Sequence, residues 1–305
     1  MEFEEFKNIP GYDKWISIKT VDKGWSGDKK YIVVDSQNNK MLLRVSSMPY
    51  YESRKKQFEL LQEVEKLNVN TSKPISFGKL NDEEIYMVLS WLEGEDAEKE
   101  VAKLSDEDAY KLGVEAGQIL RKLHTIKINK NEEMPWKEKF NLKMIRKYRA
   151  VNESKIDIPK KDLIIDYIEK NKYLLDNREQ TFTHGDYHLG NMIVNKNKIG
   201  VIDFEKNKIA DPYDDFKQFM WNAFVSEYFA TGMINGYFNN NIPEDFFPIL
   251  AVYAAEQLTS YLPWASTAED NNLEKMYAIH NCILDWYDDM KLVVPKWYKR
   301  NINFN

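Results

Sequence analysis

The segment from residue 184 to residue 205 constrains the fold of this chain more than any other feature. Within it, residues 192–195 and 199–204 have the alternation of two short strands, and residues 196–198 form a polar turn between them. The two strands of a hairpin run antiparallel, so the end of the second returns to the start of the first. The segment therefore predicts that polar groups on either side of the hairpin lie close together.

Three residues with oxygen-bearing side chains stand at these positions: Asp186, Asn191 and Asp203. Asp186 and Asn191 have the spacing of the catalytic loop H-R-D-x-x-x-x-N, with Gly185 in place of the Arg. A carboxylate in such a loop orients a hydroxyl group and accepts its proton. Oxygen ligands suit Mg²⁺, which takes its remaining ligands from phosphates and water. The pattern predicts phosphoryl transfer, with Asp186 as the base and with Asn191 and Asp203 as metal ligands.

The bulk composition is that of a globular protein. The chain has 305 residues, of which 43% are hydrophobic, and a formal net charge of −6. This length is sufficient for one large domain or for a fold of two lobes with a real core. The negative balance disfavours a broadly basic surface for nucleic acid, and we expect no nucleic-acid partner.

The location of the protein is predicted from what the chain contains. Cys282 is the only cysteine, so no intrachain disulfide can form, which is typical of the reducing cytoplasm. The sequence begins without a basic segment followed by an apolar one, so we expect no secretion signal. No apolar run approaches the roughly 18 residues that a membrane span needs. None of the four histidines has a partner at zinc spacing, and we expect structural roles for His124 and His280.

The first part of the chain has the pattern of a β-rich lobe. An amphipathic helix is predicted over residues 53–67, where the period of the apolar residues changes. The segments expected to be strands are 15–21, 30–35, 41–45, 75–80 and 84–89.

The remainder of the chain is predicted to be mainly helical. Ser105 is a good N-cap, and the acidic residues that follow it suit the positive end of a helix dipole. Further helices are expected at 163–175, 245–262 and 276–290. A strand-rich front and a helical back define an α+β fold with two lobes, which we place at residues 1–92 and 93–305.

Together these features resemble the aminoglycoside phosphotransferase family, over nearly the whole chain. The similarity rests on residues 184–191, on Ile202-Asp203-Phe204-Glu205 and on Asp211-Pro212. It implies a protein-kinase-like fold with a small β-rich N-lobe that binds nucleotide and a larger helical C-lobe that binds substrate. It also implies Mg²⁺, and ATP or GTP as the phosphoryl donor. By the same similarity, Asp211 is expected to brace the catalytic loop.

The resemblance assigns the nucleotide to three parts of the N-lobe. A glycine-rich loop would cover the phosphates, a strand cation would grip them, and the backbone after the last strand would meet the purine edge. The cation is Arg44 where protein kinases have lysine, which keeps the charge but changes the reach and the hydrogen-bonding fork. The residues so assigned are Gly24, Ser26, Gly27, Arg44, Ser90, Trp91 and Leu92.

The acidic partner of Arg44 is left open by the sequence. Glu52, Gln57 and Glu59 all lie near the expected place on the helix after the arginine strand. Gln57 and Glu59 point to different faces, because they are two positions apart.

The acceptor is expected to bind to the helical lobe. Acids near its last long helices would suit an aminoglycoside or a similar amino-sugar compound, because cationic groups need anionic partners. The alternative is that these acids belong to a solvated helix face and that the aromatic residues are core. The candidate residues are Glu256, Asp285, Asp288 and Trp286, with Trp221, Tyr261 and Trp264 as a further aromatic wall and Glu269 and Asp270 as further acids.

Two other interpretations remain at this stage. The chain can be a kinase of an ordinary metabolite of the choline, homoserine or sugar type, or a nucleotide-binding pseudokinase-like module without strong catalysis. A protein kinase is disfavoured, because Asp203-Phe204 continues with Glu205 in place of glycine and no A-P-E segment follows. The sequence leaves open whether the protein is a monomer or a dimer.

Overall fold

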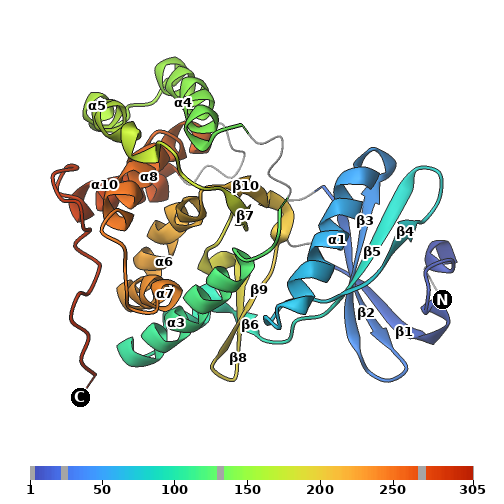
Figure 1. Cartoon of the computed structure of the whole chain (residues 1–305). Helices are drawn as coiled ribbons and strands as arrows, with labels where there is room; N and C mark the ends of the chain where they lie inside the picture. The colour runs from blue at the N-terminus through green and yellow to red at the C-terminus, as the bar shows by residue number, and fades with distance from the viewer. Residues whose placement is uncertain (1–3, 22–26, 129–133, 267–272, 305) are drawn as a thin grey trace. The chain divides into compact units, whose positions relative to one another are not determined.

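The computed structural model describes residues 4–21, 27–128, 134–266 and 273–304 (Figure 1). The chain forms two compact units. The first comprises Met1–Gly94 together with Gly200–Glu205, and the second comprises Glu95–Ile199 together with Lys206–Asn305. The first unit thus takes up a short segment that lies far away in the sequence and contains Asp203.

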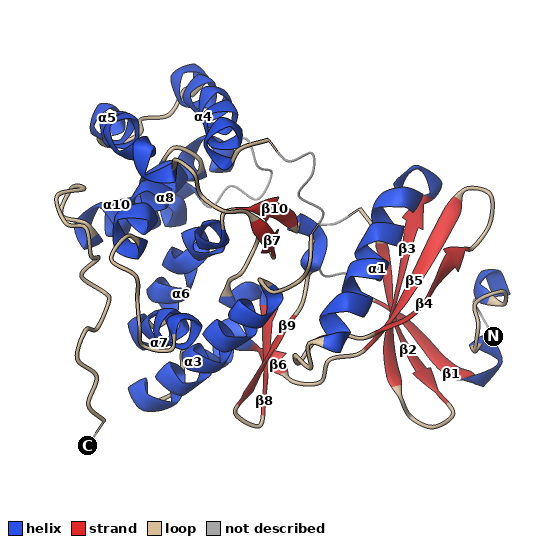
Figure 2. Cartoon of the chain, in the orientation of Figure 1, coloured by secondary structure: helices blue, strands red, loops and turns tan. Residues whose placement is uncertain are grey.

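The first unit is built on a five-stranded antiparallel sheet (Figure 2), in the order β1-β2-β3-β5-β4. Helix α1, Tyr51–Lys66, follows β3 and packs on β4 and β5. Each predicted strand and the predicted helix are confirmed within a few residues. The strands are β1 (Trp15–Thr20), β2 (Lys29–Asp35), β3 (Lys40–Ser47), β4 (Pro74–Lys79) and β5 (Glu84–Ser90).

The core of this unit lies on one face of the sheet. Val33, Leu43 and Val88 are buried there together with Phe6 and Trp15 from the start of the chain. Alternate residues of a strand point to opposite faces, so Leu43 enters this core while its neighbour Arg44 points to the other face. Arg44 is nevertheless only 7% exposed, and its charge therefore needs partners within the unit.

The second unit is mainly helical. Ser105 caps α3 as predicted, and its hydroxyl accepts a hydrogen bond from the Asp108 N–H. The helices are α2 (Ala97–Val101), α3 (Asp106–Leu123), α4 (Trp136–Glu153), α5 (Lys161–Asn171), α6 (Phe219–Val225), α7 (Glu227–Phe238), α8 (Phe246–Leu258), α9 (Tyr261–Ala265) and α10 (Leu273–Trp286). None of the helices in the described part of the chain combines the length and the apolar character of a membrane span.

Helices α3 and α7 run side by side (Figure 1). Each has two glycines four positions apart at the contact, Gly113 and Gly117 in α3 and Gly232 and Gly236 in α7. A Cβ at any of them would collide with a backbone carbonyl oxygen of the other helix. The glycines therefore allow the two backbones to touch.

Short strands hold the segment that the sequence singled out. Strand β7, Thr181–Thr183, pairs with β10, Lys208–Ala210, on either side of it. The predicted hairpin is confirmed as β8, Met192–Asn195, and β9, Lys198–Val201, to which β6, Glu95–Asp96, adds a third strand.

The second hairpin strand ends earlier than predicted. Residues 202–204 were expected to continue it, but β9 stops at Val201 and Phe204 begins a 3-10 helix. Asp203 has φ of 65°, in the left-handed region that strands do not use. The backbone therefore turns at the proposed metal ligand.

Candidate active site

The loop from His184 to Asn191 is fixed by contacts with its own unit. The N–H groups of His184 and Gly185 donate to the two carboxylate oxygens of Asp215, at 2.8 and 2.6 Å. Gly185 has φ of 83°, and a Cβ there would clash with the Lys206 carbonyl oxygen, so only glycine fits. These contacts hold the backbone of Asp186 in one place.

Asp215 therefore braces the loop, a role that the sequence suggested for Asp211. Asp211 instead caps the 3-10 helix Pro212–Gln218, and its carboxylate accepts hydrogen bonds from Arg178 at 2.8 and 3.1 Å. Tyr253 also donates to it, at 2.8 Å. These contacts fully occupy Asp211 in the core and correct that prediction. No sequence pattern distinguishes the two acids, because both follow the hairpin closely.

The carboxylate of Asp186 is surrounded by donors. Lys206 Nζ lies 2.9 Å from Oδ2, and the Asn191 amide nitrogen lies 3.0 Å from the same oxygen. Gln218 donates to Oδ1 at 3.2 Å. Lys206 and Gln218 were not predicted; the only signal was that Lys206 follows the Asp-Phe-Glu triplet.

Asp186 remains ionised in this setting. Burial acts to raise its pKa, but contacts with His188 and Lys206 outweigh burial and hold the pKa well below its usual range. His188 Nε2 lies 3.6 Å from Asp186 Oδ1, while its Nδ1 accepts the Gly190 N–H. His188 therefore both shapes the loop and adds to the field at the carboxylate.

Among the described residues, the side-chain amide of Asn191 forms hydrogen bonds through its nitrogen and not through its oxygen. Its amide nitrogen donates to the backbone carbonyl of Asp186 at 2.9 Å, as well as to the carboxylate. Within the described residues, its amide oxygen receives no hydrogen bond. An amide oxygen left in this way fits a hard cation such as Mg²⁺.

Asp203 lies in the first unit, where its carboxylate accepts the Glu205 N–H at 3.4 Å. Asp203 lies near enough to Arg44 for its negative charge to stabilise the charged guanidinium, which acts to raise the pKa of Arg44. A carboxylate that accepts a single weak hydrogen bond from the described part of the chain also fits a role as a metal ligand. Among the described residues, no cluster of three or more His, Cys, Asp or Glu side chains is placed to hold an ion.

Arg44 finds its acidic partners outside helix α1. Its guanidinium donates to Asp28, with Nε at 3.1 Å, and also forms an ion pair with Glu205. Asp28 is in turn held by Ser46 Oγ at 2.7 Å and by Arg54 of α1 at 2.8 Å. The α1 position that faces this cluster is thus a cation, where the sequence suggested an acid.

Within the described residues, none of the three α1 candidates forms an ion pair with Arg44. Gln57 accepts a hydrogen bond from Arg54 at 3.1 Å, and Glu59 pairs with Lys55. Glu52 has no ion pair with Arg44. Asp28 was predictable in principle, because β2 and β3 pair Lys29 with Val45, and one further step brings Asp28 beside Ser46.

The remaining nucleotide residues are only partly described. Gly24 and Ser26 lie outside the described residues. Gly27 is exposed, and a Cβ there would meet nothing within 4 Å. The N–H groups of Ser90 and Trp91 donate to the carbonyls of Lys73 at 2.8 Å and Lys40 at 3.1 Å, so the sheet already uses both donors.

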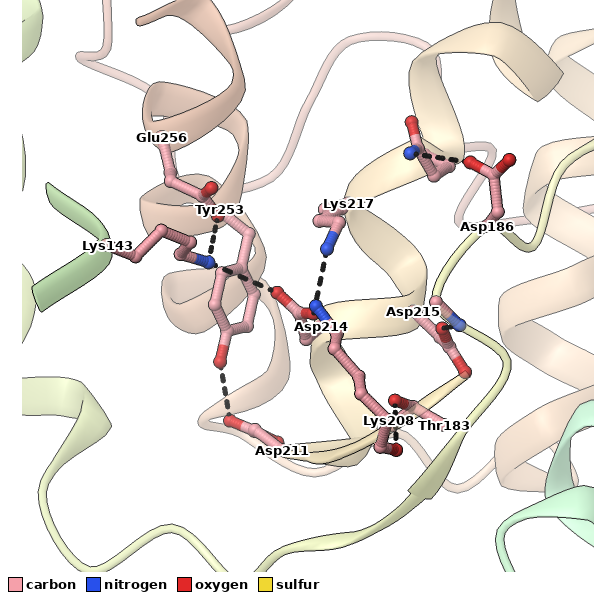
Figure 3. A network of polar contacts seen from close by, with 12 residues as sticks. Lys143, Thr183, Asp186, Lys208, Asp211, Asp214, Asp215, Lys217, Tyr253 and Glu256 are labelled. Carbon is pink, nitrogen blue, oxygen red and sulfur yellow. Dashed lines mark hydrogen bonds and ion pairs between the residues drawn. The ribbon is translucent and has the colours of Figure 1, made fainter. Parts of the chain in front are cut away.

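Three of the acids proposed for the acceptor lie in the described part of the chain, and each of these three has a cation beside it. Glu256 is 1% exposed and pairs with Lys143 at 3.0 Å (Figure 3). It also pairs with Lys147. Asp285 pairs with Lys296 at 2.8 Å and Asp288 with Lys291 at 3.5 Å. Because Glu256 is buried and neutralised, it balances charge inside the unit and presents no carboxylate to solvent.

The aromatic candidates divide between core and surface. Trp286 is 7% exposed and packs between Phe219 and Trp297, as the core alternative predicted. Trp221 makes an edge contact with Tyr261, whereas Trp264 is 57% exposed. Glu269 and Asp270 lie outside the described residues.

His124 and His280, for which we expected structural roles, both make contacts within the helical unit. His124 follows the last residue of α3, and its ring contacts the Tyr237 hydroxyl at 2.8 Å and Asp215 at 3.1 Å. His280 is fully buried, and its Nε2 contacts the Pro159 carbonyl oxygen at 3.0 Å.

Comparison with known proteins places the chain in a class. The model of the phosphotransferase enzyme family matches residues 17–246, and the chain belongs to this family. It is therefore a phosphotransferase enzyme. Among curated proteins, none matches the sequence.

Solved structures show the same fold at low identity. ADP-bound aminoglycoside phosphotransferase APH(2'')-Ib is similar with a TM-score of 0.62 at 17% identity, over 96% of this chain and 100% of that one. The GDP and kanamycin complex of APH(2'')-IIIa has a TM-score of 0.66 at 17% identity, over 92% and 96%. Amicoumacin kinase hAmiN, with AMP-PNP, Ca²⁺ and Ami, has a TM-score of 0.62 at 12% identity, over 93% and 90%. The fold is thus protein-kinase-like, with a β-sheet N-lobe and a helical C-lobe.

Proposed function

We propose that the protein transfers the γ-phosphoryl group of ATP or GTP to a hydroxyl group of a small molecule. The arrangement around Asp186 carries this proposal: a rigid loop, an ionised carboxylate and a set of donors that fix its orientation. A surface loop without function would not need a carboxylate that is buried and held ionised at once.

Asp186 acts mainly by orientation. Its oxygens accept the hydrogen bond of the acceptor hydroxyl and point the oxygen lone pair at the phosphorus atom. As the new O–P bond forms and the bond to the β-phosphate breaks, the hydroxyl proton passes to Asp186. Since its pKa is held low, this proton moves late, which suits the loose transition state of phosphoryl transfer.

Asn191 and Asp203 are the residues that we propose to hold Mg²⁺. The amide oxygen of one and the carboxylate of the other are the hard ligands that this ion prefers, with phosphate and water completing its shell. When bound, the ion neutralises charge on the phosphates. Arg44 adds a cation that Asp28 and Glu205 keep in a fixed position. Residues 1–92 are the proposed nucleotide-binding lobe, and Ser90, Trp91 and Leu92 are proposed to meet the purine.

Two acceptor classes follow from the same chemistry. Relatives of similar fold are aminoglycoside phosphotransferases, which supports an aminoglycoside or a similar amino-sugar compound as the acceptor. The ion pairs of Glu256, Asp285 and Asp288 favour the second class, an ordinary metabolite, because these acids already have cationic partners.

A nucleotide-consumption assay tests the proposal. ATP and GTP with Mg²⁺ are incubated with aminoglycosides, macrolides, amino alcohols and sugars. We expect one acceptor class to raise consumption well above the rate with water alone, and chelation of the metal to abolish the increase. Equal rates with and without every acceptor would instead support the pseudokinase-like interpretation.

The metal ligand is tested separately by calorimetry. We expect Asp203→Ala to remove the gain in nucleotide affinity that Mg²⁺ gives the native protein, because the carboxylate that holds the ion is lost. Asp82→Ala is the matched control, since Asp82 is an exposed acid in a turn of the same unit. If Asp203→Ala keeps the full effect of Mg²⁺, the assignment is wrong.

A further inference from the structure

A basic pocket of about 510 Å³ lies within the helical unit and is lined by α4 and β10. Four cationic side chains line it: Lys139, Lys143, Arg146 and Lys208. Trp136 and Ile209 are among its apolar lining residues. The described lining residues include no acid, although the whole chain has a net charge of −6.

The cations of α4 share one face of that helix. Lys139, Lys143 and Arg146 follow Trp136 at intervals of three, four and three residues, the spacing of a single helical stripe. The Lys143 ammonium also lies 5.5 Å from the centre of the Trp136 ring. The Trp136 ring itself is only 5% exposed, so the apolar surface beside these charges comes from Met134 and Leu142, which also line the pocket.

Two buried carboxylates, Asp214 and Glu256, lie beside Lys143 of this stripe (Figure 3). Asp214 pairs with Lys208 at 2.6 Å, with Lys217 at 2.8 Å and with Lys143 at 3.6 Å. Glu256 pairs with Lys143 at 3.0 Å. Both acids are almost fully buried, and their ion pairs fix the positions of the lysine side chains.

The lysines outnumber these acids. Lys147 also pairs with Glu256, so that Asp214 and Glu256 face four lysines in all. Burial and repulsion by Lys143 lower the pKa of Lys147 to about 8. Burial likewise lowers the pKa of Lys208, despite its pairing with Asp214. Burial acts to lower the pKa of Lys217, but Asp214 raises it. Among the described residues, this network holds more lysines than carboxylates.

Lys143 has unused hydrogen-bonding capacity. Its Nζ is buried, and within the described residues none of its contacts has hydrogen-bond geometry, although two carboxylates lie within ion-pair distance. A buried ammonium in this condition gains free energy from an additional acceptor. An oxyanion in the pocket would add negative charge near this ammonium group.

The pocket is connected to Asp186 by two short segments. Lys206 contacts Asp186, and Lys208, two residues later, lines the pocket. Gln218 contacts Asp186, while the preceding Lys217 pairs with the buried Asp214. The pocket and Asp186 are therefore joined by two short stretches of chain.

We propose that this pocket binds the phosphate group of an organic phosphate, with the organic part against the exposed lining residues Met134 and Leu142. Several cations around one cavity favour a multiply charged oxyanion over a single carboxylate. We also propose that this ligand is the acceptor, so that the enzyme acts on an anionic metabolite; this second part rests on the proposed function.

Calorimetry with glucose 6-phosphate, in the absence of nucleotide, tests the pocket, and glucose is the uncharged control. We expect binding of the phosphate ester only, weakened by added salt. Arg146→Glu should weaken it at least about tenfold, because a cation is replaced by an anion at the site. Arg149→Glu, the same change one turn further along α4 at a residue that does not line the pocket, should leave binding within about twofold.

Equal effects of the two substitutions, or equal binding of glucose and its phosphate, would contradict the proposal that the pocket binds a phosphate group.

The proposal that this ligand is the acceptor has its own readout, the KM of the best acceptor from the consumption assay. We expect Arg146→Glu to raise this KM with little change in kcat. An unchanged KM together with weakened glucose 6-phosphate binding would overturn the acceptor part alone. Binding without any phosphoryl transfer would overturn the proposed function and leave the pocket standing.

Discussion

Two residues, Lys206 and His188, control the ionisation of Asp186. Lys206 lies 2.9 Å from its carboxylate, and His188 contributes from within the loop. Both favour the charged form against the effect of burial. A carboxylate held in this way is ready to orient a hydroxyl at any pH near neutrality.

Replacement of Lys206 tests this control. In Lys206→Met we expect the pKa of Asp186 to rise, because a cation that stabilises the carboxylate is removed. Since we propose that the ionised form is the active one, the acidic limb of the profile of kcat/KM against pH should move to higher pH. Lys198→Met, at an exposed lysine of β9, is the control and should leave the limb in place. A limb that stays or moves to lower pH in Lys206→Met would contradict the account.

At the scale of the elements, the contact of α3 with α7 depends on four glycines. No other residue allows the two backbones to approach so closely, because a Cβ at Gly117 would meet the Met233 carbonyl oxygen. That oxygen belongs to a helix backbone and cannot move without disturbing the whole turn.

We expect Gly117→Ala to lower the free energy of unfolding by about 1–3 kcal/mol or more, as overpacking in a tight core does. Urea unfolding followed by circular dichroism measures the loss. Gly27→Ala is the control for this measurement, since a Cβ there has open space around it. Equal stability of the two variants would show that the helices separate easily.

Glu256 joins α8 to α4 through Lys143 and Lys147. In Glu256→Gln we expect the free energy of unfolding to fall by about 3–5 kcal/mol, because Lys147 loses its carboxylate and Lys143 keeps only the more distant Asp214. Glu107→Gln, at an exposed pair with Lys111, should change stability by less than about 1 kcal/mol. A Glu256→Gln variant with normal stability and a raised acceptor KM would instead return Glu256 to the substrate site.

Glu256 also makes the stability of the protein depend on pH. Burial raises the pKa of Glu256, but the neighbouring lysines lower it to about 2 from 4.5. Its contribution to stability is therefore complete above pH 4.5 and is lost as the pH falls towards 2. We expect the native protein to lose more stability than Glu256→Gln over this interval.

At the scale of the whole molecule, local patterns predicted the fold well. The N-lobe strands, α1, α3 with its Ser105 cap and the hairpin of β8 and β9 all follow from alternation, helical periodicity and turn residues. The prediction did not identify α4, α6 and α7. Helix α4 carries many charges and aromatic residues and has no clear cap. Helices α6 and α7 are buried on most sides. None of these three helices therefore shows a single apolar stripe in the sequence.

The site was less predictable than the fold. Asp28, Arg54, Lys206 and Asp215 act through contacts between residues far apart in the chain, and no spacing rule reports such contacts. The substrate acids were inferred from their charge alone. Their lysine partners lie on other segments, so that pairing becomes visible only in three dimensions.

The central claim is that Asp186 performs phosphoryl transfer and does not merely support nucleotide binding. The most direct test measures transfer of the γ-phosphoryl group and nucleotide affinity together in Asp186→Asn, with Asp166→Asn at an exposed helix position as the control. The account predicts that kcat falls by about 10²–10⁴-fold while nucleotide affinity stays near that of the native protein. A variant that transfers phosphoryl groups at the native rate would contradict it.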